Sequence, residues 1–396
     1  MDYRFADRVK QFKTSAISET TEIIRRGKNV ISFAGGFPNN QYFPDEALQR
    51  AFEQVFASGS GALQYGMIQG YLPLREAIGV KMSKNEIASK PEDILVTTGS
   101  QQAIDLVSRI MLSAGDVVLT ENPTFLAALQ AFSSYEAKVV PVEGDQDGMF
   151  PEDLEEKLQR YKPKFIYVVP TFSNPDGKVW SEARRQALLE LAYRYDTLIL
   201  EDDPYGDIQF RPEERYTPLI ALDRQRTHVL YTSTFSKSVV PAIRTGWITG
   251  PGQIIRLLTQ IKEAADLMSS SIDQQALYYL LRDFDLDAHV RMLGTRYREH
   301  MQTMQSYLKQ LDPATVSWIE PKGGMFLWVK LGEQVDATAL LAKAVEQGVA
   351  FIPGAPFYVE NPQRNTIRMN FTQMSPQEIA TGMERLVKVL GQEQRE

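Results

Sequence analysis

Short apolar runs alternate with amphipathic stretches through the middle of the chain. Each run is rich in valine and isoleucine and is bounded by Gly, Pro, Asn or Asp. Such runs are typical of strands buried on both faces of a parallel sheet. The runs are Ile94–Thr97, Val117–Leu119, Lys138–Val142, Phe165–Val169, Leu198–Leu200, Val229–Tyr231 and Gly246–Thr249. They predict a mostly parallel seven-stranded sheet.

Amphipathic helices are expected between these strands. Apolar side chains in Gln101–Leu112 and in Ser181–Tyr195 recur at helical spacing, and Ser181 is suited to cap the second helix. An alternation of strands and helices of this kind indicates an α/β layered domain with helices on both faces of the sheet.

The pattern changes after about residue 285. The remaining elements that the chain predicts are helices over 14–27, 286–311 and 376–390 and extended segments at Val30–Phe33, Met325–Lys330, Val349–Ile352 and Thr366–Asn370. These elements are typical of a smaller α+β domain. We therefore expect a large domain over 48–285 and a small domain formed by 1–47 together with 286–396.

The composition narrows the class of protein. With 396 residues the chain is long enough for two domains, and 43% apolar with 23% charged residues indicates a folded globular protein. The net charge of −7 argues against a general affinity for nucleic acid or anionic membranes. The chain has neither a signal-peptide core nor an apolar run near the ~20 residues of a membrane span. We expect a cytoplasmic protein with no membrane or nucleic-acid partner.

Metal and thiol chemistry are not expected. The chain has no cysteine, which excludes disulfides and thiolate nucleophiles. Its three histidines, His228, His289 and His300, lack the spacing of a metal site.

Lys237 is the first candidate for chemistry. It lies just beyond a predicted strand, at the edge of the sheet where α/β proteins place ligands. A lysine partly removed from water there has a lowered pKa and can act as a Schiff-base nucleophile. The hydroxyls of Thr234 and Ser236 and the cation of Arg244 suit a phosphate. An isolated lysine is usually solvated, so this interpretation depends on its neighbours.

Three further motifs also follow predicted strands. Thr98-Gly99-Ser100-Gln101 precedes a helix whose free amides can bind an anion. Glu201-Asp202-Asp203-Pro204-Tyr205 contains carboxylates that need a cationic partner if buried, such as a protonated pyridine nitrogen. Asn174 lies in a turn-forming segment. Each motif alone fits an ordinary capped or solvated turn, whereas all of them together at strand ends indicate one ligand site.

With these motifs in this order, the chain resembles the fold-type I pyridoxal 5′-phosphate (PLP)-dependent aminotransferases of class I/II. The resemblance spans most of the chain and is closest to the 2-aminoadipate and kynurenine aminotransferase branch. The segments that carry it are Ser32–Pro38, Leu63–Gly66, Thr98–Gln102, Glu121–Phe125, Asn174–Gly177, Glu201–Tyr205, Thr234–Lys237, Arg244 and Ile367–Phe371.

The resemblance implies a role for each site residue. Lys237 binds PLP as a Schiff base and moves the substrate's α-proton, and Asp202 keeps the pyridine nitrogen protonated. Asn174 and Tyr205 bind the phenolic oxygen, and Phe125 stacks on the ring. Arg368, with Asn174 and Gly36, binds the substrate, its guanidinium clamping the α-carboxylate. The residues implied for the phosphate are Ser100, Gln101, Thr234, Ser236, Arg244 and, from the second subunit of a homodimer, Tyr65.

The chain departs from the family pattern at three places, of which one bears on the substrate. Phe125 replaces a tyrosine, which keeps the stacking but loses a hydroxyl, and the family's Asn-Pro-Thr-Gly reads Asn174-Pro-Asp-Gly177. Ser18 stands where 2-aminoadipate enzymes commonly carry an arginine. The resemblance implies an amino donor of the 2-aminoadipate, aromatic or branched-chain type and a 2-oxo acid acceptor such as 2-oxoglutarate, and Ser18 favours the aromatic or branched donors. Arg25 or Arg26 is the alternative cation for a distal carboxylate.

Two alternative functions stay open from the sequence. A PLP-dependent lyase or decarboxylase can use the same fold, although Arg368 favours transamination. A regulatory ligand-binding protein with an aminotransferase-like domain is a remote alternative, because the residues before Ile94 already hold family motifs and no basic patch is evident.

Overall fold

The larger sheet of the molecule has seven strands. The computed structural model describes residues 3–6, 8–9 and 16–393, apart from the side chains of residues 16–19, 26 and 393. In this part of the chain the strand order is β2-β10-β9-β8-β7-β3-β4. The strands are β2 (Ile94–Thr97), β3 (Val117–Thr120), β4 (Lys138–Pro141), β7 (Phe165–Val168), β8 (Leu198–Asp202), β9 (Val229–Thr234) and β10 (Gly246–Thr249). Only β10 runs antiparallel to its neighbours, which confirms the predicted sheet.

Two strands of the large sheet extend two or more residues further than the apolar pattern predicted. The predicted ends at Leu200 and Tyr231 were wrong, because β8 continues to Asp202 and β9 to Thr234. The added residues are polar but buried, and Asp202 pairs in register with Thr232 of the neighbouring strand. Their polarity hid the strand ends, while pairing with adjacent strands keeps the backbone extended.

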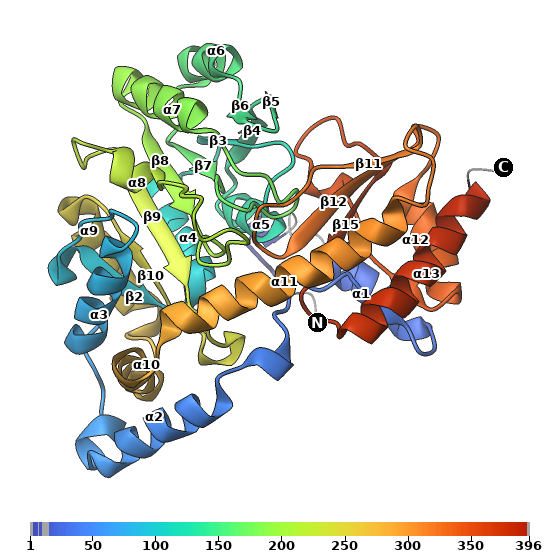
Figure 1. Cartoon of the computed structure of the whole chain (residues 1–396). Coiled ribbons are helices and arrows are strands. Elements are labelled where there is room, and N and C mark those ends of the chain that lie inside the picture. Colours follow the sequence, from blue (N-terminus) through green and yellow to red (C-terminus); the bar gives the residue numbers. More distant parts are fainter. Residues whose placement is uncertain (1–2, 7, 10–15, 394–396) are drawn as a thin grey trace.

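Helices cover both faces of this sheet (Figure 1). On one face, α4 (Gly99–Met111), α5 (Leu126–Ser134) and α9 (Gly252–Asp266) pack on strand residues such as Leu95, Tyr167 and Leu230. On the other face, α6 (Pro151–Tyr161), α7 (Glu182–Tyr195) and α8 (Leu219–Leu222) pack on Ile166 and Ile199. Most sheet residues between these layers are buried, as the continuous apolar runs require.

A third group of helices packs against β2, β9 and β10. It contains α2 (Asp45–Ala57), α3 (Leu72–Ser83) and α10 (Ser271–Asp283), whose shared core includes Val55, Ile78 and Leu277. A short hairpin, β5 (Gly144–Asp145) with β6 (Gly148–Met149), extends from the opposite side. Short 3₁₀ turns lie at Asn40–Tyr42, Ser60–Leu63, Pro91–Asp93, Pro241–Ile243 and Ala355–Phe357.

The C-terminal part of the chain forms a second layer beside the large sheet. Its antiparallel sheet has the order β11-β12-β15-β14, and β1 pairs in parallel with β13. Its elements are α1 (Ala16–Arg26), β1 (Ile31–Ser32), α11 (Leu286–Leu308), β11 (Val316–Trp318), β12 (Phe326–Leu331), α12 (Ala337–Glu346), β13 (Val349–Ala350), β14 (Ile352–Pro353), β15 (Thr366–Asn370) and α13 (Pro376–Glu393). Through β1, the N-terminal segment thus pairs with a strand of the C-terminal elements.

Two details of this layer differ from the sequence prediction. The single strand expected over Val349–Ile352 is two strands, β13 and β14, which pair with different partners on either side of Phe351. The helix expected over 14–27 is described from Ala16 to Arg26, and its first two predicted residues lie outside the described part of the chain. Within that part, no helix is long and apolar enough to cross a membrane.

Candidate active site

A cavity of about 420 Å³ lies where the large sheet meets the C-terminal layer. The carboxyl ends of β8 and β9 supply Asp202 and Thr234, and β12 and β15 supply Phe326 and Arg368 from the other side. Every site residue that the sequence predicted lines this cavity except Tyr65. Those residues are Gly36, Ser100, Gln101, Phe125, Asn174, Asp202, Tyr205, Thr234, Ser236, Lys237, Arg244 and Arg368. The structure therefore brings together residues that are up to 332 positions apart in the chain, from Gly36 to Arg368.

Lys237 lies three residues beyond the end of β9 and its ammonium group lies in the cavity. Its Nζ donates a hydrogen bond of 2.8 Å to the carbonyl oxygen of Gly36. Burial, and then the nearby cations of Arg244 and Arg368, lower the pKa of Lys237 to about 8. An appreciable fraction of its amine is therefore unprotonated near neutral pH, as nucleophilic addition to a carbonyl requires.

Asp202 presents a carboxylate oxygen that has no partner. It is the last residue of β8 and is 2% exposed. Its Oδ2 accepts a hydrogen bond of 2.8 Å from the hydroxyl of Tyr167, whereas its buried Oδ1 has no partner in the described part of the chain. Burial raises the pKa of Asp202 to about 7, against the opposing hydrogen bond of Tyr167. A cationic N–H group in the cavity would satisfy this oxygen and restore the charged form.

The two acidic neighbours of Asp202 are already satisfied on the other face of the strand. Glu201 accepts the backbone amides of Leu219 and Ile220, and Asp203 accepts the hydroxyl of Tyr231 at 2.9 Å. Side chains alternate along a strand, so the acidic run directs only Asp202 into the cavity.

The amino end of α4 and the β9–β10 connection form an anion site. Ser100 and Gln101 lie in the first turn of α4, where the backbone amides are free. Nη1 of Arg244 donates to Oγ of Ser236 at 3.1 Å, and the hydroxyl of Thr234 accepts the Ser236 amide at 3.1 Å. These donors suit the phosphate of a cofactor.

Arg368 is a buried guanidinium without an acidic partner. It is 3% exposed, and burial lowers its pKa to about 10. Its Nη2 donates to the carbonyl of Ala34 at 2.7 Å, and no ion pair of Arg368 with a carboxylate is found among the described residues. The rings of Phe326 and Phe357 lie 4.4 and 5.1 Å from its Cζ. An anion that enters the cavity would supply the missing counter-charge.

Asn174 connects this guanidinium to a buried tyrosine. Its Oδ1 accepts a hydrogen bond of 2.8 Å from Nη1 of Arg368, and its Nδ2 lies 3.5 Å from the hydroxyl of Tyr205. Burial raises the pKa of Tyr205, which keeps its hydroxyl protonated and able to donate. The ring of Phe326 packs edge-on against Tyr205 at 5.7 Å, and Phe125 lines the cavity as well.

These groups fit PLP on three counts. The unpartnered Oδ1 of Asp202 matches a protonated ring nitrogen, and the half-buried Lys237 matches the aldehyde. The donors around Ser236 and Arg244 match the phosphate. In the described part of the chain no group of His, Asp or Glu side chains could hold a metal ion.

Several residues in and around the cavity did not follow from the sequence. Tyr167 reaches Asp202 from the neighbouring strand, and the only signal was a tyrosine inside an apolar run, whose hydroxyl needs a partner when buried. Phe326, Ile352 and Gln373 come from the C-terminal layer and carry no motif. Tyr65 is 77% exposed and lies outside the cavity. The side chain of Ser18 lies outside the described residues.

Comparison with known proteins gives consistent matches over the whole chain. The family model described as "Aminotransferase class I and II" matches residues 28–386. The aromatic-amino-acid aminotransferase 1 of Thermococcus litoralis is 37% identical, over 100% of this chain and 96% of its own. The kynurenine aminotransferase of Pyrococcus horikoshii, solved with PMP, is 36% identical with a TM-score of 0.92, over 98% and 97% of the two chains. The α-aminoadipate aminotransferase of Thermus thermophilus, solved with N-(5′-phosphopyridoxyl)-L-leucine, is 33% identical with a TM-score of 0.90, over 98% and 97%.

Proposed function

The chain belongs to the class I and II aminotransferases and acts as a PLP-dependent transaminase, and from this we propose that its amino donor is an aromatic or branched L-amino acid. We propose 2-oxoglutarate as an acceptor. We also propose that the enzyme is a homodimer that works in the cytoplasm.

The lining of the cavity carries the proposal on the donor. Beyond the cofactor groups, its walls are mainly apolar, with Ile24, Ala34, Phe37, Phe326 and Ile352. Burying an apolar side chain there contributes about 1.5–3 kcal/mol. The names of similar enzymes, which include aromatic-amino-acid and kynurenine aminotransferases, support the same donor class.

The positions of the cations argue against a distal carboxylate on the donor. Among the described residues, only Lys237, Arg244 and Arg368 bring a positive charge to the cavity, and each has a proposed role there. Arg25 is exposed and does not line it, and the side chain of Arg26 is outside the described residues. The acceptor 2-oxoglutarate carries a distal carboxylate of its own, and we propose that the polar groups of Ser32 and Gln373 at the cavity wall accept it in place of a cation.

The proposed mechanism assigns one task to each group. Bound PLP supplies an electron sink for the bonds at the substrate α-carbon. Lys237, with its lowered pKa, holds the cofactor and then moves the proton of that carbon. Asp202 holds a proton at the ring nitrogen, and Tyr205 with Asn174 donates to the phenolic oxygen. Arg368 binds and orients the α-carboxylate, which favours transfer of the amino group over loss of that carboxylate.

The assignment of Lys237 is tested by trapping. We expect borohydride reduction of the purified, cofactor-loaded enzyme to fix the cofactor on the peptide that contains Lys237. Lys237→Ala should lose this label and nearly all turnover, because no other described lysine lines the cavity. Lys157→Ala, on the outer helix α6, is the control and should keep both. A label on any other lysine would refute the assignment.

The donor class is tested by comparing substrates. We expect kcat/KM with 2-oxoglutarate to be higher for phenylalanine or leucine than for 2-aminoadipate, because a buried distal carboxylate without a cation costs several kcal/mol. Steady-state rates across a panel of amino donors measure this. If 2-aminoadipate is better by tenfold or more, another cation must read its distal carboxylate and the proposal is wrong.

A further inference from the structure

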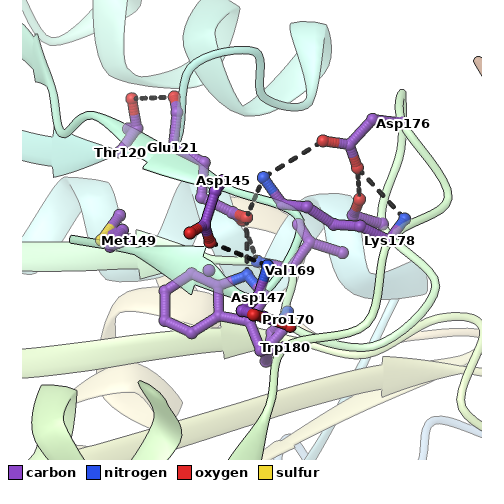
Figure 2. Close-up of polar contacts among 12 residues, drawn as sticks. Thr120, Glu121, Asp145, Asp147, Met149, Val169, Pro170, Asp176, Lys178 and Trp180 are labelled. Atoms are coloured by element: carbon purple, nitrogen blue, oxygen red, sulfur yellow. Dashed lines mark hydrogen bonds and ion pairs between the residues drawn. The ribbon is translucent and has the colours of Figure 1, made fainter. Parts of the chain in front are cut away.

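Three charged side chains are buried close together (Figure 2), and none of them lines the cavity. Nζ of Lys178 lies 3.1 Å from Oδ2 of Asp176 and 3.4 Å from Oε1 of Glu121. The three residues are 8%, 5% and 3% exposed. Burial lowers the pKa of Lys178, but the two carboxylates outweigh it and raise the pKa above the usual value, so the lysine is charged.

Glu121 ties together the two arms of the loop that follows β7. It lies directly after β3, and its Oε2 accepts the backbone amide of Val169 on the entering arm at 2.8 Å. Its Oε1 accepts the indole Nε1–H of Trp180 on the leaving arm, also at 2.8 Å. The amide of Trp180 donates to the carbonyl of Pro170 at 2.9 Å, which closes the base of the loop. Both carboxylate oxygens of Glu121 therefore hold this base.

Asp176 and Lys178 brace the far part of the same loop. The hydroxyl of Ser173 and the amide of Lys178 both donate to Oδ1 of Asp176. The amide of Gly177 donates to the carbonyl of Ser173 at 2.8 Å. These bonds surround Asn174, so the lysine links the base held by Glu121 to the turn that carries Asn174.

The tip of this loop meets the C-terminal layer. Gly177 has φ of +69°, and a Cβ atom there would lie 2.6 Å from the carbonyl oxygen of Phe326 in β12. Beside it, Oδ1 of Asn174 accepts the 2.8 Å hydrogen bond of Arg368 in β15, the strand next to β12. The loop thus spans from the large sheet to the residue proposed to bind the substrate carboxylate.

We infer that Glu121, Lys178 and Asp176 are positioning residues that fix the loop over 169–180 and, through Asn174, orient the guanidinium of Arg368 for the substrate. Removing one partner of a buried ion pair leaves the other charge buried without compensation. Loss of one of these charges should therefore destabilise the native conformation of the loop. Removal of the lysine charge should free Asn174 while every group in the cavity stays chemically intact. The inference rests on the proposed role of Arg368.

Lys178→Met, which keeps much of the side-chain volume, is the central test. We expect KM for the amino donor to rise between about tenfold and about a hundredfold, because displacement of a binding group by about 1 Å has effects of this size. In the cofactor-free protein, hydrogen–deuterium exchange should increase in the peptide over 169–180. Lys178→Arg keeps the charge and should restore both properties in large part.

Two further variants separate positioning from general destabilisation. Lys157→Met removes a similar lysine, paired with Asp153 at 2.6 Å on α6, and should change neither KM nor exchange of the loop. Asp176→Asn removes one carboxylate and leaves Lys178 paired with Glu121, so it should show a weaker form of both effects. If Lys178→Met fails to fold, Asp176→Asn decides the outcome.

A double variant tests whether the effect passes through Arg368. In an Arg368→Lys background the guanidinium is gone, so adding Lys178→Met should raise KM much less than it does in the wild type. Equal fold-changes in both backgrounds, or an unchanged KM in Lys178→Met together with faster loop exchange, would overturn the inference. Failure of the proposed function is distinguishable, because the wild type itself would then not transaminate these donors.

Discussion

The buried carboxyl group of Asp202 is suited to the cofactor but destabilises the protein when the cofactor is absent. Its carboxyl group is 2% exposed and has a single hydrogen-bond donor, Tyr167. Burial consequently raises its pKa to about 7 from the usual 3.8. A protonated ring nitrogen at the unpartnered Oδ1 would favour the carboxylate again. The charged form of Asp202 is therefore disfavoured in the cofactor-free protein and favoured when the cofactor is bound.

This arrangement predicts a pH dependence of stability in the cofactor-free protein. Because the folded pKa of Asp202 lies above the unfolded value, its contribution is fully present below about pH 4 and is lost as pH rises through about 7. The difference corresponds to at most about 4 kcal/mol. We expect the melting temperature of Asp202→Asn, relative to that of the wild type, to increase as pH rises from about 5 to about 8. Thermal unfolding across this pH range measures the difference.

Cofactor-loaded protein is the comparison for this prediction. There, Asp202→Asn should be less stable than the wild type at pH 8, because the ion pair at the ring nitrogen is lost. A constant difference between the two cofactor-free proteins at every pH would show that Asp202 is not buried in its neutral form near pH 5.

At the scale of elements, Gly99 allows the amino end of α4 and the guanidinium of Arg244 to form one anion site. Gly99 has φ of +73°, and a Cβ atom there would lie 2.5 Å from Nη2 of Arg244. The missing side chain lets the guanidinium lie against the first turn of the helix, next to Ser100 and opposite Ser236. The helix amides and the arginine therefore face the same point.

Gly99→Ala should weaken cofactor binding by displacing Arg244. Gly115→Ala is a matched control, because Gly115 has φ of +85° but open space around its Cβ position. Both variants should lose about 1–2 kcal/mol of unfolding free energy from backbone strain. Only Gly99→Ala should raise the dissociation constant for PLP, measured by fluorescence titration of the cofactor-free protein. Equal dissociation constants in the two variants would contradict the role of Gly99.

At the scale of the whole molecule, two layers meet at the cavity and each supplies part of it. We propose that they are domains, a large one over 48–285 and a small one over 1–47 and 286–396, with α11 leading from one to the other (Figure 1). Lys237 and Asp202 belong to the first, and Gly36 and Arg368 to the second. The hydrogen bonds from Lys237 to Gly36 and from Arg368 to Asn174 both cross this boundary.

The exposed segment around Tyr65 motivates the proposed homodimer. Leu63, Tyr65 and Met67 are 59%, 77% and 67% exposed, and the amide of Gly66 contacts Sδ of Met268 beside the exposed Leu267. Apolar side chains gathered in this way are typical of an interface. We expect Met67→Glu to yield a monomer with low activity, and sedimentation velocity with activity at matched dilution measures this.

Tyr65→Phe separates assembly from cofactor binding. It should keep the dimer and bind PLP more weakly, because the hydroxyl is proposed to reach the phosphate in the partner subunit. Full activity of a Met67→Glu monomer would exclude a shared site.

The sequence by itself determined the sheet and the main chemical groups. Seven apolar runs predicted the strands, because a strand that is buried on both faces is apolar along most of its length. Motifs that follow those strands indicated Lys237, Arg244 and a carboxylate of the run Glu201–Tyr205, since the ends of parallel strands meet at one edge of a sheet, and the family resemblance implied Asp202. These inferences needed only residues close together in the chain.

Only the tertiary structure decided which distant groups touch. The bonds from Tyr167 to Asp202, from Asn174 to Arg368 and from Lys178 to Glu121 depend on strand order and on the packing of two layers. β7 lies between β3 and β8, so its loop faces residues from both, and no local pattern encodes that neighbourhood. The physical reason is that burial is encoded residue by residue, whereas orientation within the site is set by long-range contacts.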